Sequence, residues 1–141
     1  MSKLLQRLSD ATKSGVYRAP HARDIEQAAR GSALAVVRIP LAGASAKGAV
    51  LERIAAALTF PDWFGGNWDA LEDCLGDLSW MPASGHVLLF EDSAQVARDE
   101  RGILVDILAS TAAERSARGR PFFAVFLGDD PALPALYRAS G

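Results

Sequence analysis

The sequence is poor in cysteine and histidine: it has one cysteine, Cys74, and two histidines, His21 and His86. A single cysteine excludes an internal disulfide, and so few thiol and imidazole groups argue against a zinc site of the usual spacing. The apolar runs are too short to cross a bilayer, and the first residues lack the long apolar stretch of a secretory leader. We therefore expect a cytoplasmic single-domain protein with no metal, no cofactor and no membrane contact.

Basic residues are missing from the middle of the chain. Between Arg53 and Arg98 there is no lysine or arginine, but there are seven acidic residues: Asp62, Asp69, Glu72, Asp73, Asp77, Glu91 and Asp92. Residues 1–30, in contrast, have six basic and three acidic residues. Nucleic-acid binding needs lysine and arginine to displace the counterions of the phosphates. The pattern therefore disfavours direct nucleic-acid binding and suits a basic protein partner, although a merely solvated acidic face is the plainer interpretation.

Three short apolar runs, at 34–39, 86–90 and 122–127, predict β-strands. Because they are nearly continuous rather than alternating, they favour a parallel sheet covered by helices. Helical patterns lie at 47–58, from Asn67 onward, at 93–98 and at 100–118. The predicted fold is α/β, with a three-stranded parallel sheet in the order β-α-α-β-α-α-β.

The two ends of the chain fall outside this pattern. Residues 1–32 are predicted to form a helical N-terminal extension, with helices at 3–13 and 21–30 and a weak indication of a strand at 16–18. Residues 33–128 form the predicted domain. Residues 129–141, which contain Pro131 and Pro134, are predicted to be an irregular C-terminal tail.

A helix that begins after Asn67 places its charges on one arc. At about 100° per residue the acidic side chains share one side, which we call the acidic stripe: Asp69, Glu72, Asp73 and Asp77. The opposite arc is apolar and makes Cys74 a core residue. Like charges four residues apart cost a few tenths of a kcal/mol each, and no lysine or arginine offsets them. A cationic partner would explain this arrangement, and Trp63 in the preceding loop could anchor it.

The run from Trp63 to Leu75 resembles the signature of the barstar family, the intracellular inhibitors of barnase-type ribonucleases, and weaker similarity extends over 34–127. The resemblance implies a parallel-sheet domain whose acidic helix and preceding loop plug a ribonuclease active site, with carboxylates in place of RNA phosphates. It makes Asp73 the central phosphate mimic and Asp69 its neighbour. The implied partner-binding residues are Trp63, Gly65, Asn67, Asp69, Glu72 and Asp73.

The chain also departs from the family. Glu72 stands where the family's namesake has an aromatic residue, and the acidic contact of the last long helix has no clear match near Ser110. These departures leave the identity of the partner open.

Two other functions remain possible at this point. The acidic helix could bind a different basic protein, or the basic residues of 1–30 could mediate self-association; the oligomeric state is open. Paired carboxylates could also catalyse hydrolysis, but an exposed helix offers no evident cleft, and Cys74 with His86 makes an improbable catalytic pair. His86 is expected at a strand end or on the surface. We predict a binding protein with no catalytic residues and not an enzyme.

Overall fold

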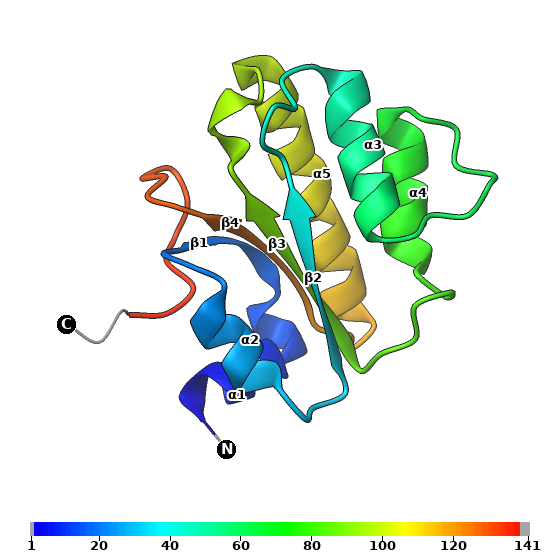
Figure 1. Cartoon of the computed structure of the whole chain (residues 1–141). Coiled ribbons are helices and arrows are strands. Elements are labelled where there is room, and N and C mark those ends of the chain that lie inside the picture. The colour runs from blue at the N-terminus through cyan, green and yellow to red at the C-terminus, as the bar shows by residue number, and fades with distance from the viewer. Residues whose placement is uncertain (1, 139–141) are drawn as a thin grey trace.

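The computed structural model describes residues 2–138 and contains a four-stranded sheet in the order β1-β4-β3-β2, in which all neighbours are parallel (Figure 1). The strands are β1 (Gly15–Ala19), β2 (Leu34–Pro40), β3 (Gly85–Glu91) and β4 (Phe122–Leu127). The α-helices are α1 (Lys3–Leu8), α2 (Arg23–Ala29), α3 (Lys47–Ala57), α4 (Trp68–Asp77) and α5 (Arg98–Ala117), and two 3-10 helices span Ala11–Lys13 and Ser93–Gln95. No helix of residues 2–138 is both long and apolar enough to cross a membrane.

The prediction of three strands was wrong by one. The fourth strand, β1, comes from the first 32 residues and pairs with β4 from Gly15 opposite Phe123 to Ala19 opposite Leu127. Tyr17 stacks on Phe123 with the ring centroids 5.8 Å apart. The strand is short and contains Arg18, so its own composition only weakly indicates a strand. It is stabilised by the apolar edge of β4, which lies more than one hundred residues away in the chain.

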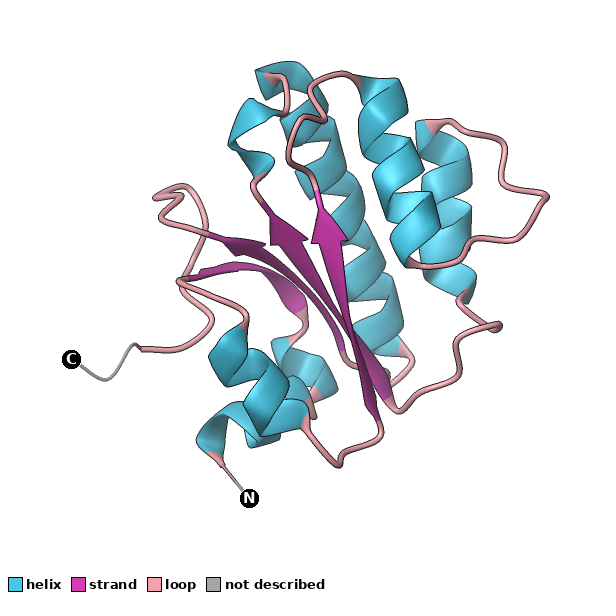
Figure 2. Cartoon of the chain, in the orientation of Figure 1, coloured by secondary structure: helices cyan, strands magenta, loops and turns pink. Residues whose placement is uncertain are grey.

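Helices cover both faces of the sheet (Figure 2). Leu88 and Phe90 of β3 point into the larger core, which contains the apolar faces of α3, α4 and α5. The alternate residues Val87 and Leu89 point into a smaller core, to which α1 and α2 contribute Leu8 and Ile25. The two central strands are thus buried on both faces, as their continuous apolar sequences predict.

Helix boundaries differ from the predictions near the amino terminus. The helix predicted at 3–13 ends at Leu8, and a 3-10 turn follows in which Asp10 accepts a hydrogen bond from the Thr12 amide at 2.9 Å. The short helix at 93–98 is a single 3-10 turn, and α5 begins at Arg98. The Asp10 side chain thus caps a local turn at the expense of a continuous helix.

Both terminal segments contact the sheet. Beyond β4, the Arg18 amide donates to the Pro134 carbonyl at 2.8 Å, and the Leu136 amide donates to the Arg18 carbonyl at 2.9 Å. The last residues of the predicted tail, 139–141, lie outside the described residues. The boundaries at 32/33 and 128/129 stay a prediction.

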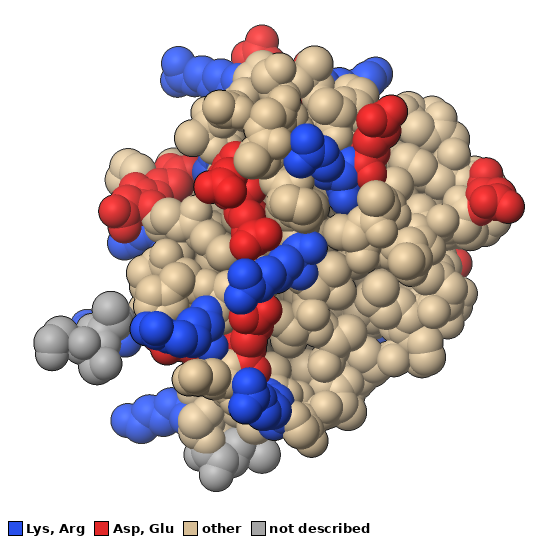
Figure 3. Space-filling model, in the orientation of Figure 1, with Lys and Arg blue, Asp and Glu red and all other residues tan. Residues whose placement is uncertain are grey.

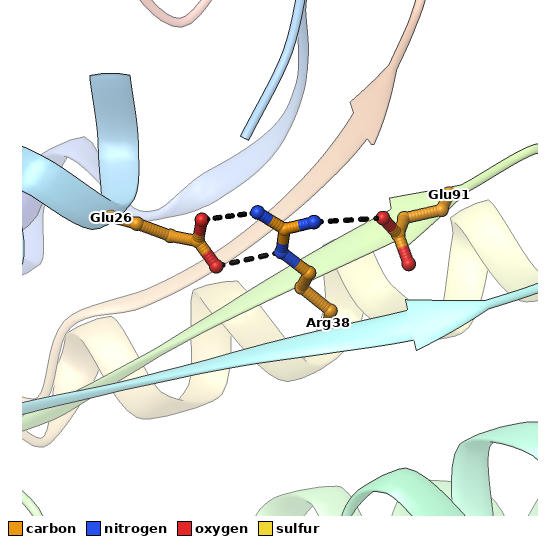
Figure 4. Close-up of polar contacts among 3 residues, drawn as sticks. All are labelled: Glu26, Arg38 and Glu91. Carbon is orange, nitrogen blue, oxygen red and sulfur yellow. Dashed lines mark hydrogen bonds and ion pairs between the residues drawn. The ribbon is translucent and has the colours of Figure 1, made fainter. Parts of the chain in front are cut away.

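Arg38 connects α2 to the sheet. Its Nε donates to a carboxylate oxygen of Glu26 at 2.7 Å, and its Nη1 lies 3.4 Å from Glu91 Oε2 (Figure 4). Glu26 belongs to α2, whereas Glu91 ends β3, so one guanidinium bridges the amino-terminal helices and two strands.

Candidate functional site

The amino end of α4 is fixed by local sequence. The Oδ1 atom of Asn67 accepts a hydrogen bond from the Ala70 amide at 2.7 Å, which makes Asn67 the N-cap. Gly66 has a φ of +72°, a conformation that side chains with a Cβ rarely adopt. Gly65, a predicted site residue, has no such constraint, because a Cβ there would meet the Ala70 Cβ and the Asn67 amide at 3.6 Å, an ordinary contact. The loop conformation therefore depends on Gly66 and Asn67.

Replacing Asn67 with alanine removes this cap. We expect the free energy of unfolding to fall by about 1 kcal/mol, the usual cost of losing an N-cap side chain. Urea denaturation measures the change. The variant Asn67→Asp keeps an oxygen acceptor and should retain most of the stability. An equal loss in both variants would contradict a capping role.

The two arcs of α4 behave as the helical periodicity predicts. Leu71, Cys74 and Leu75 are fully buried, whereas all four carboxylates of the acidic stripe are exposed. Burial raises the pKa of the Cys74 thiol, and the nearby charges of Asp73 and Asp77 raise it further. Cys74 is thus a core residue with a thiol that is disfavoured as a nucleophile.

The loop before α4 displays one aromatic side chain. Trp63 is 58% exposed, whereas Phe60 and Phe64 pack against the larger core. The Trp63 ring meets the Trp80 ring edge to face at a centroid distance of 6.0 Å. Trp80 is held in turn by a hydrogen bond from its indole nitrogen to the Leu58 carbonyl at 2.9 Å. The supporting role of Trp80 was missed at the sequence level, because no local pattern connects it to the loop.

The acidic stripe lacks ion-paired partners in the described part of the chain. Within residues 2–138, none of its four carboxylates forms an ion pair. Other acidic side chains of the chain do: Glu26 and Glu91 pair with Arg38, and Asp130 pairs with Arg101. On the face shown in Figure 3, acidic and basic side chains accordingly stand next to one another over the region of α2 and β2.

A hollow of about 450 Å³ lies between α4 and α5. It is lined by three residues of the stripe, by Gly76, and by two residues of α5, Glu114 and Arg118. The sequence offers no clear match near Ser110 for an acidic contact on the last helix, but Glu114, about one turn further along, lies beside the stripe. Arg118 also reaches this hollow and pairs with Glu114 four residues earlier. The acidic surface therefore extends onto α5, where it is partly neutralised.

His86 is the second residue of β3 and so lies at a strand end, one of the two positions predicted, but it is not at the surface: only 2% of it is exposed. Its Nε2 lies 2.8 Å from the Met81 carbonyl oxygen, and its Nδ1 lies 3.4 Å from Nη2 of Arg115. A carbonyl only accepts and a guanidinium only donates, so the ring is neutral, with the proton on Nε2. The strand end is buried because the segment before it, which contains Met81, folds against His86.

This environment predicts a loss of stability in acid. Burial and the positive charge of Arg115 lower the pKa of His86 in the folded protein. Below about pH 6.5 the unfolded chain therefore binds a proton that the folded chain does not, with a slope of at most about 1.4 kcal/mol per pH unit. Urea denaturation above and below this pH measures the fall in the free energy of unfolding. This fall should be smaller for His86→Gln than for the wild type. The assignment would be contradicted if His86→Gln lost as much free energy of unfolding in acid as the wild type does. It would also be contradicted if the control His21→Gln, at an exposed site, lost less than the wild type.

Comparison with known families bears on this same region. A family model described as Barstar (barnase inhibitor) matches residues 34–127. The match covers most of the chain, including the loop at 60–66, α4 and α5, and it confirms the resemblance carried by the run from Trp63 to Leu75. A comparison with curated proteins finds no match.

Proposed function

The chain belongs to the barstar family of barnase inhibitors, and on this premise we propose that it binds and inhibits a barnase-type ribonuclease. The observation that carries the proposal is the acidic stripe: four exposed carboxylates on α4 that form no ion pair within residues 2–138. Such an arrangement repels itself and gains most from an external cationic surface.

The expected mechanism is electrostatic occlusion. A ribonuclease active site holds the RNA phosphates with cationic side chains, so carboxylates can occupy the same positions and exclude the substrate. Complementary charge also accelerates association at low salt, and this acceleration fades as salt rises. In the bound state, a carboxylate that accepts two hydrogen bonds from one arginine gives a strong and directional contact.

Each predicted site residue has a proposed part in this mechanism. Asp73 is the central phosphate mimic, flanked by Asp69 and Glu72. Trp63 is the aromatic anchor at the edge of the interface, because it is exposed and supported by Trp80. Asn67 holds the start of α4 as its N-cap, and Gly65 lies in the loop that precedes it.

The direct test is inhibition of RNA cleavage. Purified full-length chain is titrated against barnase and other ribonucleases of that type, and cleavage of a fluorogenic RNA is followed. Stoichiometric inhibition of at least one enzyme is expected, with loss of inhibition in the double variant Asp69→Ala/Asp73→Ala. If the double variant inhibits as well as the wild type, the stripe is not the binding surface.

A second candidate is a binding module that associates with itself. Residues 1–30 are basic overall, and α1 and α2 pack on the opposite face of the sheet from α4. The basic segment therefore cannot cover the stripe of its own molecule, and only a head-to-tail contact between copies would do so. Light scattering at low and high salt discriminates: oligomers that dissociate with salt favour this candidate, whereas a monomer at low salt excludes it.

Catalysis is not part of the proposal. The stripe carboxylates are exposed on a helix surface, whereas a general acid usually sits where burial tunes its pKa. The absence of enzymatic activity stays a prediction.

A further inference from the structure

A second hollow, of about 400 Å³, lies at the carboxyl ends of α4 and α5. It opens where the segment between α4 and β3 passes beside the end of α5 (Figure 1). Three arginines and one histidine line it: His86, Arg115, Arg118 and Arg120. The single acidic residue in its lining is Asp77, which forms no ion pair within residues 2–138.

Arg115 is a buried cation without a carboxylate partner. Only 2% of it is exposed, and no acidic group of residues 2–138 forms an ion pair with it. Its Nη1 donates to the carbonyls of Leu75 and Gly76 at 3.3 and 3.2 Å, and its Nε has no partner in the described part of the chain. Carbonyls at a helix end supply only part of a negative charge, so a buried guanidinium here remains incompletely compensated.

The neighbouring cations increase this imbalance. Burial lowers the pKa of Arg115 and the charges of Arg120 and Arg118 lower it further, whereas the charges of Glu114 and Asp77 offset part of this effect. Arg118 has Glu114 as a partner, but the exposed Arg120 has no ion pair within residues 2–138. Positive side chains are therefore clustered around the buried Arg115, and they line a concave site.

We propose that this hollow binds the phosphate group of a small phosphate monoester. Arg120, whose side chain forms no ion pair within residues 2–138, is the residue expected to donate paired hydrogen bonds to phosphate oxygens. Arg118, which pairs with Glu114, and the buried Arg115 add positive charge to the same hollow. A volume of about 400 Å³ falls in the range of roughly 300–1,000 Å³ typical of small-molecule sites, so there is room for more than the phosphate alone. None of the six predicted partner-binding residues lines this hollow, although Gly76, Asp77 and Arg118 also line the hollow between α4 and α5.

The test is calorimetric titration of the full chain with adenosine monophosphate, inorganic phosphate and adenosine at constant ionic strength. Saturable binding of one adenosine monophosphate is expected, with no binding of adenosine. Binding of inorganic phosphate at equal strength supports recognition of the phosphate alone, and tighter binding of the nucleotide supports an ester ligand. Absence of binding by both phosphates, or equal binding of adenosine, overturns the proposal.

Variants separate a built site from general attraction to a positive surface. Arg120→Gln should weaken binding at least tenfold, and because Arg120 is exposed the variant should fold normally. Arg98→Gln removes the same charge from the exposed start of α5 and should bind like the wild type. Equal weakening in both variants overturns the proposal. In nuclear magnetic resonance spectra the Arg115 Nε–H signal should shift on titration with adenosine monophosphate, and an unmoved signal counts against the site.

Discussion

Replacing Asp73 with alanine is expected to weaken binding of a barnase-type ribonuclease by about 3–5 kcal/mol, or roughly 150- to 5,000-fold in Kd, because the cation that it faces would stay buried and uncompensated in the complex. Asp73 lies in the middle of the acidic stripe, four residues from Asp69 on one side and from Asp77 on the other. It is also one of the residues that line the hollow between α4 and α5. A cation that enters this hollow meets Asp73 together with Glu72 and Asp77.

The same replacement should leave the free protein as stable as before. Asp73 is exposed and makes no ion pair within residues 2–138. Its removal ends two like-charge contacts on α4 and introduces a residue with higher helix propensity. Urea denaturation should therefore give an unchanged or slightly larger free energy of unfolding. A loss of binding with retained stability identifies a surface contact rather than a folding defect.

Calorimetric titration against the inhibited ribonuclease measures the effect, and Asp129→Ala is the matched control. Asp129 is exposed near the end of β4 and carries the same charge. Its replacement should change binding only through the small loss of long-range attraction, which high salt removes. If Asp73→Ala and Asp129→Ala bind equally well, net charge rather than the stripe governs association.

The sequence predicted α4 well because its determinants are local. The Asn67 cap, the glycine before it and the apolar period of three to four residues lie within one short segment. The exposure of the stripe follows from the same period, since the buried positions Leu71 and Leu75 leave the carboxylates on the other side. The continuous apolar sequences of β3 and β4 likewise predicted burial on both faces.

The features that sequence reasoning missed depend on contacts between distant segments. Glu114 reaches the stripe only because α5 packs against α4, and Trp80 supports Trp63 only because the segment after α4 folds back. From the sequence alone, Arg115 is a basic residue in the last turn of α5, where a positive charge stabilises the helix end. In the fold it is buried and caps the end of α4 instead. Propensity and periodicity carry no information about such pairings.

Shortening Leu8 to alanine is expected to lower the free energy of unfolding by about 2–5 kcal/mol, the usual cost of truncating a fully buried leucine. Leu8 is 0% exposed and belongs to the smaller core together with Ile25, Val87 and Phe123. Although it precedes residue 34, where the family match begins, it packs on the same strands as the rest of the domain. Urea denaturation measures the change, and Ile103→Ala, at a 41% exposed site on α5, should cost much less.

The Leu8 variant decides whether residues 1–32 form a separable extension. If they did, the truncation would loosen only that segment, and the main unfolding transition, followed by tryptophan fluorescence, would keep its midpoint. All three tryptophans, Trp63, Trp68 and Trp80, lie outside residues 1–32. We expect instead that the fluorescence midpoint shifts with the loss of stability, because β1 completes the sheet beside β4 and Leu8 packs beneath it.

Deletion of residues 1–32 would then expose the edge of β4 and the apolar side chains of the smaller core, and should give a chain that associates rather than one that unfolds cooperatively. A shortened chain that is monomeric and unfolds at the wild-type midpoint would place the domain boundary at residue 32 after all.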